Sequence, residues 1–284
     1  MLADKINISL LSQFINIRIT KNFSDIKPND YDILMVNSDQ TWKMWNKHHY
    51  LNIGFLKFSK NWNIRKFVYG ASIGSNTFNI PNYAEKEAKI LLKNFSGFSV
   101  RENQTIPIIE KHLGIRPLFV LDPTLLLDKN RYLNLINDYK GDFDIHNKYL
   151  CNYKVHNNKK MNIFLNKSSK ELNYKIVVHN PKNRDDYIQR FLYCIYYSQA
   201  VITSSFHGTI FSIMFNKPFV SFQGDDNDER FNTLNEIFGI RNRIIKNNEK
   251  PNISLLTTPL NINFDKFKKM RDISNKFLKE QLFF

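Results

Sequence analysis

His207 is the side chain of this sequence that is best placed to move protons. It follows a buried β-branched run at 200–203 and the hydroxyl residues at 203–205, and it stands at the predicted start of a helix. The carboxyl ends of strands in an open parallel sheet face the ligand crevice, and backbone N–H groups at a helix start attract anions. An imidazole there would act as an acid or base beside a bound phosphate or carboxylate.

The neighbours of His207 predict how such a site is built. Gly208 permits a close approach of the backbone, because it has no side chain. The hydroxyl residues suit a helix cap, and contact with a phosphate is the alternative. The candidate substrate-binding residues at this junction are Ser204, Ser205, Phe206, Gly208 and Thr209. For His207 itself, the alternative is a capping or packing role.

A second polar cluster follows the apolar run at 31–36 and contains Asp39, Gln40 and Trp42. A carboxylate, an amide and an aromatic face are what a sugar site uses, because the polar groups bond hydroxyls and the ring stacks on the C–H face of the sugar. We therefore expect these three residues to bind substrate, with the indole exposed. The alternative is an Asx turn beside a Trp in the core.

Arg101 stands at the end of another expected strand, 97–100, just before a predicted helix. A guanidinium in that place can make a two-point contact with a carboxylate or a phosphate, so Arg101 is a candidate for binding an anionic substrate. The alternative is a surface pairing with Glu102. Asp122 and Pro123 follow a further strand, and we interpret them mainly as a structural corner.

The elements that position these residues alternate along the chain. Short apolar runs are separated by stretches of helical periodicity, which predicts an α/β protein with mainly parallel sheets. The expected strands are 31–36, 66–71, 97–100, 118–121, 148–153, 174–178, 200–203 and 218–222. The expected helices are 83–94, 104–112, 155–166, 185–198, 207–215, 231–238 and 265–281. A polar stretch at 122–141 predicts two domains, 1–140 and 141–284, with the last helix closing the second.

Composition excludes several classes of protein. The net charge is +15, but the basic residues are scattered and not interleaved with stacking aromatics, which argues against nucleic-acid binding. The two cysteines have no metal-ligand spacing, so neither a disulfide framework nor a metal site is expected. The motifs of Rossmann dehydrogenases, P-loop kinases, serine hydrolases and zinc proteases are missing. No signal peptide or spanning segment is expected, which predicts a cytoplasmic protein with at most peripheral membrane association.

Six motifs in this order resemble those of the polysaccharide pyruvyl transferase family, over about residues 31–245. They are Asn37-Ser38-Asp39-Gln40-Thr41-Trp42, Tyr69-Gly70-Ala71-Ser72-Ile73-Gly74, Ser99-Val100-Arg101-Glu102, Asp122-Pro123-Thr124-Leu125-Leu126-Leu127, Thr203-Ser204-Ser205-Phe206-His207-Gly208-Thr209 and Lys217-Pro218-Phe219. The resemblance implies a GT-B-like fold, in which two Rossmann-like parallel-sheet domains face a cleft. It also implies that the N-terminal domain is abbreviated, because the strand at 31–36 comes so early.

The family resemblance implies transfer of a pyruvyl group from phosphoenolpyruvate to two hydroxyls of a sugar, in the biosynthesis of cell-surface polysaccharide. The implied partners are phosphoenolpyruvate and a sugar or lipid-linked oligosaccharide, with no metal and no cofactor. His207 corresponds to the family's histidine, and Arg101 to the arginine that holds the donor. Many members carry Arg where this chain has Ser205, and Lys217 is a candidate to supply that cation.

Two other functions stay open at this point. One is a GT-B glycosyltransferase that uses a nucleotide sugar, whose diphosphate would occupy the same helix start without a metal. The other is a shortened, catalytically inactive relative that acts as a binding protein.

Overall fold

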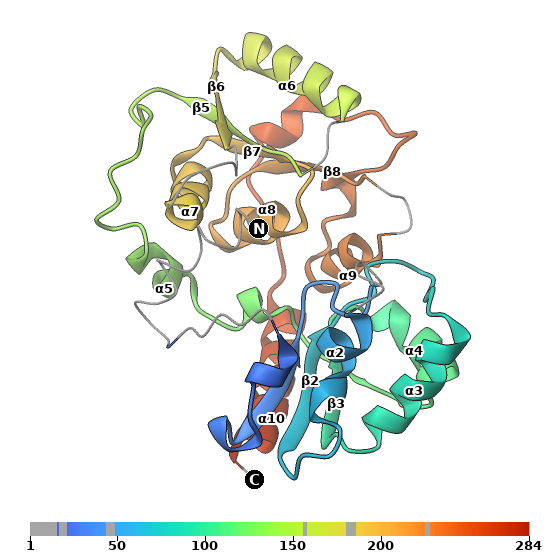
Figure 1. The fold of residues 1–284 in the computed structure, drawn as a ribbon. Helices are drawn as coiled ribbons and strands as arrows, with labels where there is room; N and C mark the ends of the chain where they lie inside the picture. Colours follow the sequence, from blue (N-terminus) through green and yellow to red (C-terminus); the bar gives the residue numbers. More distant parts are fainter. Residues whose placement is uncertain are drawn as a thin grey trace. The chain divides into compact units, whose positions relative to one another are not determined.

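The computed structural model describes residues 16, 22–43, 49–155, 158–179, 186–224 and 228–283. The chain forms two compact units, each built around its own sheet (Figure 1). The described residues of the β1–β4 unit fall within Ile19–Leu126, Asn227–Phe238 and Asn263–Phe284. Those of the β5–β9 unit fall mainly within Leu127–Asp226 and Gly239–Ile262.

The sheet of the β1–β4 unit is wholly parallel and has the order β1-β2-β3-β4. Its strands are β1 (Ile33–Asn37), β2 (Arg65–Ala71), β3 (Gly97–Val100) and β4 (Leu118–Phe119). The helices of this unit are α2 (Tyr50–Phe55), α3 (Asn82–Leu92), α4 (Ile106–Leu113), α9 (Glu229–Phe238) and α10 (Asp265–Phe283). Since both faces of the sheet are covered, β2 is a nearly continuous run of buried residues.

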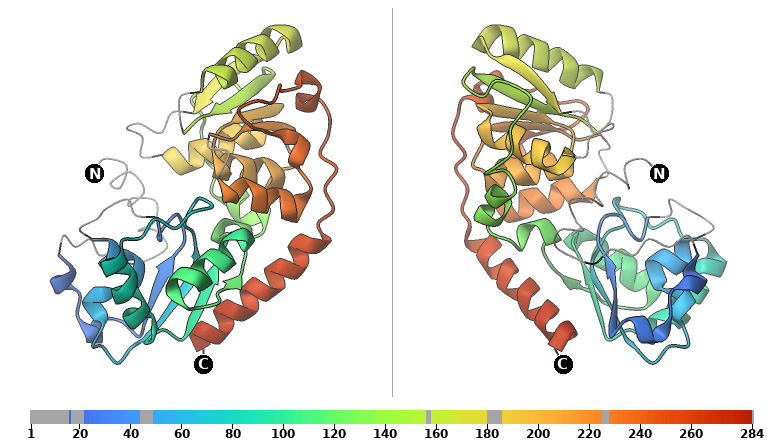
Figure 2. Two further views of the ribbon diagram at one scale, coloured as in Figure 1. Left: turned by 90° about the vertical axis from the view of Figure 1, so that its right-hand side faces the viewer. Right: turned by 60° about the vertical axis from the view of Figure 1, so that its left-hand side comes forward.

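The two faces of β2 meet different partners because successive side chains of a strand point to opposite sides. Val68 belongs to the larger core, which includes residues of α2, α3 and α4. Phe67 and Tyr69 face α10, where Phe277 lies 6.3 and 6.2 Å from them between ring centroids. The hydroxyl of Ser274, also on α10, accepts a 2.9 Å hydrogen bond from the N–H of Leu121. Helix α10, red in Figures 1 and 2, is thus an integral part of the β1–β4 unit.

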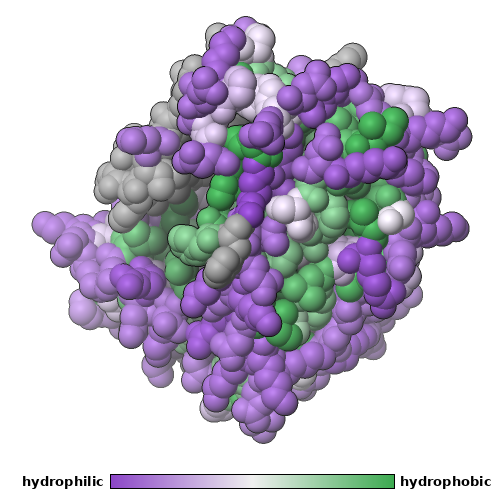
Figure 3. Space-filling view, turned by 90° about the horizontal axis from the view of Figure 1, so that it is seen from below, coloured by the Kyte–Doolittle hydropathy of each residue, from purple (hydrophilic) through white to green (hydrophobic). Residues whose placement is uncertain are grey.

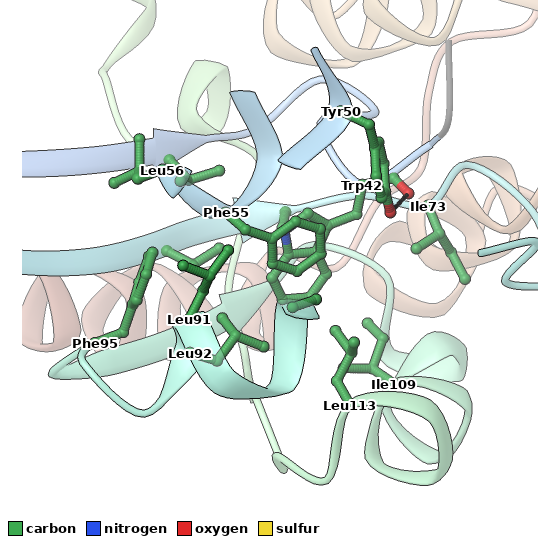
Figure 4. Packing of buried hydrophobic residues seen from close by; sticks show 14 of the residues in the cluster. Trp42, Tyr50, Phe55, Leu56, Ile73, Leu91, Leu92, Phe95, Ile109 and Leu113 are labelled. Atoms are coloured by element: carbon green, nitrogen blue, oxygen red, sulfur yellow. Dashed lines mark hydrogen bonds between the residues drawn. The ribbon is translucent and has the colours of Figure 1, made fainter. Parts of the chain in front are cut away.

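The larger core of the β1–β4 unit is shown in Figure 4. The indole of Trp42 stacks on Phe55, with ring centroids 5.7 Å apart and an angle of 4° between the planes. The hydroxyl of Tyr50 donates a 2.9 Å hydrogen bond to the carbonyl of Trp42. This packing ties the segment after β1 to α2.

The sheet of the β5–β9 unit is also wholly parallel, in the order β6-β5-β7-β8-β9. Its strands are β5 (Tyr149–Tyr153), β6 (Lys175–His179), β7 (Ala200–Thr203), β8 (Phe219–Phe222) and β9 (Ile244–Ile245). Its helices are α5 (Lys129–Asn134), α6 (Lys159–Leu172), α7 (Tyr187–Tyr197) and α8 (Phe206–Met214). Helix α6 packs its buried side chains against Leu150, Ile202 and Val220 on one face of the sheet. Helices α7 and α8 cover the other face of the sheet. There the hydroxyl of Thr209 on α8 is hydrogen-bonded to the hydroxyl of Ser221 on β8.

The predicted α/β class is confirmed, and the differences from prediction are local. Strands β3 and β7 have the predicted bounds, whereas β9, α2 and α5 were not predicted. The division of the chain falls at Leu126 and Leu127, not near residue 140, and the last helix joins the first sheet. The expected abbreviation of the N-terminal domain concerns residues that mostly lie outside the described ranges. Short 3-10 helices lie at Phe23–Asp25, Pro28–Asp30, Lys57–Ser59, Asn103–Thr105, Pro123–Leu125, Arg241–Arg243 and Ile253–Leu256.

Hydrophilic side chains dominate the face of the molecule in Figure 3, and hydrophobic residues form patches between them. Among the described residues, no helix has both the length and the apolar character needed to cross a bilayer.

Candidate functional site

The ends of the parallel strands gather the predicted residues at one edge of each sheet. In the β1–β4 unit, Asp39 follows β1, Arg101 follows β3 and Asp122 follows β4. In the β5–β9 unit, His207 comes shortly after β7. Parallel strands place their carboxyl ends on the same side of a sheet, so each unit has its own cluster.

Arg101 is the centre of the cluster in the β1–β4 unit. Its guanidinium bonds three carboxylates: Asp39 at 2.5 Å, Glu102 at 3.3 Å, and Asp122. Asp122 is itself held, because it accepts a 2.9 Å hydrogen bond from the N–H of Thr124 as the cap of a short helix. Burial opposes the charge of Arg101, but the three carboxylates outweigh it and raise its pKa. The Asp122 corner thus has an electrostatic role that the sequence did not indicate.

Only part of this cluster meets solvent. The side chain of Arg101 is 1% exposed, and that of Asp39 is 62% exposed. Arg101 therefore bonds Asp39 from the protein interior, and the Asp39 carboxylate carries the negative charge that faces solvent. In this arrangement the guanidinium orients Asp39 and does not itself lie open to an anionic substrate.

Glu102 is a fully buried acid beside Arg101. Burial raises the pKa of its carboxyl to about 7, against the opposing effect of the Arg101 charge. Its second oxygen, Oε2, has no hydrogen-bond partner in the described part of the chain. The surface pairing considered for Arg101 and Glu102 is therefore corrected: the pair is buried, and Glu102 binds a proton near neutral pH.

Arg230 is a residue of this cluster that the sequence did not reveal. It lies near the start of α9 and forms a two-point contact with Asp228, at 2.8 and 2.7 Å. One of its nitrogens lies 3.8 Å from the same oxygen of Asp39 that Arg101 bonds. Its side chain is 19% exposed, so it is the more accessible of the two guanidiniums. The available signal was a basic residue directly before the predicted helix at 231–238.

Gln40 completes the cluster from a strained backbone position. It has a left-handed φ of 51° and is 8% exposed. With its amide oxygen turned toward α9, it accepts 3.2 Å hydrogen bonds from both terminal nitrogens of Arg230. A side chain at Gly74 would come within 2.4 Å of the Gln40 amide, so the glycine makes room for it. Gln40 therefore links the end of β1 to α9.

Trp42 does not have the predicted exposure. The residue is 1% exposed, and its indole N–H donates a 2.9 Å hydrogen bond to the carbonyl of Gly54. Its ring stacks on Phe55 in the core shown in Figure 4. The expectation of a sugar-stacking indole is corrected in favour of the alternative, a core Trp beside a polar turn.

His207 is the accessible residue of the cluster in the β5–β9 unit. Between residues 200 and 213, all of which the structure describes, it alone is not buried. It lies in the first turn of α8, whose cap is the Ser205 hydroxyl accepting a 3.2 Å hydrogen bond from the N–H of Gly208. A side chain at Gly208 would approach the Thr203 hydroxyl to 2.4 Å. Cap and glycine together fix the helix start that presents the imidazole.

The other residues predicted to bind substrate at this junction are used by the fold. Ser204 accepts a 3.1 Å hydrogen bond from the N–H of Val155. The hydroxyl of Thr209 is buried between the Ser205 carbonyl and Ser221, at 3.0 and 2.5 Å. Phe206 is 6% exposed. These hydrogen bonds agree with the capping role considered for the hydroxyl residues, and contact of Ser204, Ser205 and Thr209 with substrate stays a prediction.

Lys217 lies at the wrong end of α8 to replace an arginine beside His207. Its ammonium donates a 3.0 Å hydrogen bond to the carbonyl of Ser198, which precedes β7. Burial lowers the pKa of Lys217. Ser198 is at the amino end of β7, whereas His207 follows the carboxyl end of that strand. The expectation that Lys217 supplies the cation that Ser205 does not is therefore corrected.

The clusters offer acids, guanidiniums and an imidazole. Among the described residues, no group of three or more His, Cys, Asp or Glu side chains could hold a metal ion.

Comparison with known proteins gives one family and one fold. The sequence profile described as polysaccharide pyruvyl transferase matches residues 3–226. A crystal structure of Methanocaldococcus jannaschii UDP-GlcNAc 2-epimerase in complex with UDP-GlcNAc and UDP is similar with a TM-score of 0.54 and 14% sequence identity. The likeness covers 97% of this chain and 88% of that one, and it agrees with the predicted GT-B-like fold class. No curated protein is similar enough in sequence to count as a match.

Proposed function

Because this chain belongs to the polysaccharide pyruvyl transferase family, we propose that it transfers the pyruvyl group of phosphoenolpyruvate to two hydroxyls of a sugar, forming a cyclic ketal. The observation that carries the proposal is the family match over residues 3–226, which includes Asp39, Arg101 and His207. The proposed acceptor is a sugar or lipid-linked oligosaccharide of a cell-surface polysaccharide.

The proposed chemistry starts at the methylene carbon of phosphoenolpyruvate. Protonation of that carbon makes a methyl group and leaves an electron-poor centre at C2, which the first sugar hydroxyl attacks. The C2–O bond to phosphate breaks, the second hydroxyl bonds C2, and inorganic phosphate leaves. One hydroxyl proton replaces the proton delivered to carbon, and the other leaves with phosphate.

The described side chains have distinct roles in this proposal. His207 delivers the proton to carbon, because it is the accessible imidazole at the start of α8. Asp39 accepts a proton from the acceptor, because it is the solvent-facing carboxylate of its cluster. Arg101 orients Asp39, and Arg230 supplies positive charge for the donor. A positioned acid or base typically contributes ~10²–10⁴-fold to the rate.

Mass spectrometry tests the proposal directly. The protein is incubated with phosphoenolpyruvate and candidate sugar acceptors, and the products are examined for a pyruvyl ketal adduct and for released phosphate. Adduct and phosphate in equal amounts support the proposal. Phosphate without adduct would show hydrolysis of phosphoenolpyruvate and counts against ketal transfer. Neither product with a broad acceptor set also counts against it and favours a binding protein.

A nucleotide-sugar enzyme is the second candidate, and one observation favours it. The structurally similar epimerase is in complex with UDP-GlcNAc and UDP, so that protein binds a nucleotide sugar on a related fold. Thermal unfolding with each ligand alone separates the candidates. A higher Tm with phosphoenolpyruvate favours pyruvyl transfer, and a higher Tm with a nucleotide sugar alone favours the second candidate.

A further inference from the structure

A groove on the β5–β9 unit joins lysines to apolar side chains, of which Ile163 is the exposed one. The groove has a volume of about 510 Å³ and lies between α6 and the segment around Pro251. We call it the α6 groove, and its lining residues are Lys159, Lys160, Ile163, Phe164, Lys167, Lys250, Pro251 and Ile253. None of the residues in this lining is acidic.

The charges of the α6 groove are not neutralised by neighbours. In the described ranges of the chain, none of its four lysines forms an ion pair. Lys160 bonds the backbone carbonyls of Lys246 and Asn247, at 3.1 and 3.0 Å, and so fixes the helix to the loop. The groove therefore carries a formal charge of +4 from its four lysines.

The apolar part of the groove includes one largely exposed side chain. Ile163 is 61% exposed and lies one helical turn from Lys159 on one side and from Lys167 on the other. The opposite side of α6 already packs into the core through Met161 and Leu165. Ile163 is thus not needed by the core, and an apolar residue between lysines suits an interfacial helix.

We propose that the α6 groove docks the protein on a bilayer that contains anionic phospholipid. Lysines would lie at the phosphate level, while Ile163 would enter the acyl boundary. A nucleic acid fits less well, because the aromatic side chain of the groove, Phe164, is 4% exposed and cannot stack on a base. Docking uses none of the residues assigned to catalysis, and α6 is on the sheet face opposite α8.

Co-sedimentation with vesicles tests the proposal without any need for turnover. The wild-type protein should bind phosphatidylcholine vesicles that contain phosphatidylglycerol, and should not bind phosphatidylcholine alone. Each lysine near an anionic surface is worth about fivefold in binding, so Lys159→Gln, Lys167→Gln and Lys250→Gln together should weaken it about 100-fold. Ile163→Ser should weaken it roughly tenfold, with little change in Tm.

A matched variant separates a docking site from general positive charge. Lys268→Gln, Lys269→Gln and Lys276→Gln remove the same charge from the exposed face of α10 and should leave vesicle binding within about twofold. Equal loss in both triple variants would overturn the proposal. So would failure of the wild type to bind anionic vesicles, or binding of RNA with the same lysine dependence and no effect of Ile163→Ser.

Discussion

Arg101 and Asp39 form an ion pair that is buried at one end and open at the other. The guanidinium donates a 2.5 Å hydrogen bond to the carboxylate, and the two side chains are 1% and 62% exposed. Removing either partner should therefore have different effects. Loss of the cation disturbs the interior, whereas loss of the anion changes what the site presents to a ligand.

Asp39→Asn should abolish most activity and leave the fold intact. We expect kcat to fall by ~10²–10⁴-fold, because the amide cannot accept a proton, with the free energy of unfolding within about 1 kcal/mol of wild type. Steady-state kinetics and urea denaturation measure the two effects. An unchanged kcat would remove Asp39 from the proposed mechanism.

Arg101→Met should instead destabilise the protein by ~3–5 kcal/mol, because the buried carboxylate of Asp122 would be left without its cation. Urea denaturation measures the change. Arg116→Met is the matched control, since Arg116 is 73% exposed and pairs with an exposed glutamate, and it should cost less than about 1 kcal/mol. A similar loss in the free energy of unfolding for both substitutions would contradict the conclusion that Arg101 neutralises buried carboxylates.

Glu102 should make stability fall as pH rises toward neutrality. Burial raises its pKa from 4.5 to about 7, so the folded chain binds its proton more tightly than the unfolded chain. The resulting stability is complete below pH 4.5 and is lost as the pH rises through about 7, by roughly 3 kcal/mol. Denaturation of wild type and Glu102→Gln at pH 5 and pH 8 isolates this contribution. If the free energy of unfolding changes equally with pH in the two proteins, the pKa of Glu102 is the same in the folded and the unfolded chain.

His207→Gln should lower kcat by ~10²–10⁴-fold, because glutamine keeps polar groups at the position but cannot deliver a proton. The Tm should change little, since His207 is only half-buried. His112→Gln is the control: His112 is also half-buried, pairs with Glu85 at 2.9 Å, and should retain activity. Equal activity of both variants would exclude His207 as the acid.

Arg230→Met should weaken donor binding more than it slows turnover. A hydrogen bond to a charged group is worth about 1.5–3 kcal/mol, so we expect the KM for phosphoenolpyruvate to rise roughly 10–100-fold. Arg241→Met removes the same charge from an exposed pair with Glu249 and should leave KM unchanged. A matching rise in both variants would point to net charge as the cause.

The local pattern of the sequence predicts elements better than it predicts exposure. The bounds of β3 and β7 follow from short apolar runs closed by polar residues. The burial of Trp42 depends on α2, a short helix without a clear period, and on a hydrogen bond to Gly54. Lys217 was misplaced because the sequence gives the length of α8 but not the end of the sheet at which a flexible side chain settles.

Arg230 was missed for a different reason. Its partners, Asp39 and Gln40, are far from it in sequence, and only the return of α9 to the β1–β4 unit brings them together. An amphipathic pattern shows that one face of a helix is buried, but not which sheet buries it. The same limit explains why α10 was assigned to the second domain.

The place of α10 has a consequence for synthesis on the ribosome. Phe67 and Tyr69 are made early, but Phe277, which covers them, comes after the whole of the β5–β9 unit. One apolar face of the first sheet therefore stays uncovered while the rest of the chain is synthesised, and the β1–β4 unit completes its folding last. A nascent chain that stops before α10 would therefore contain every strand of the first sheet and still leave Phe67 and Tyr69 without Phe277.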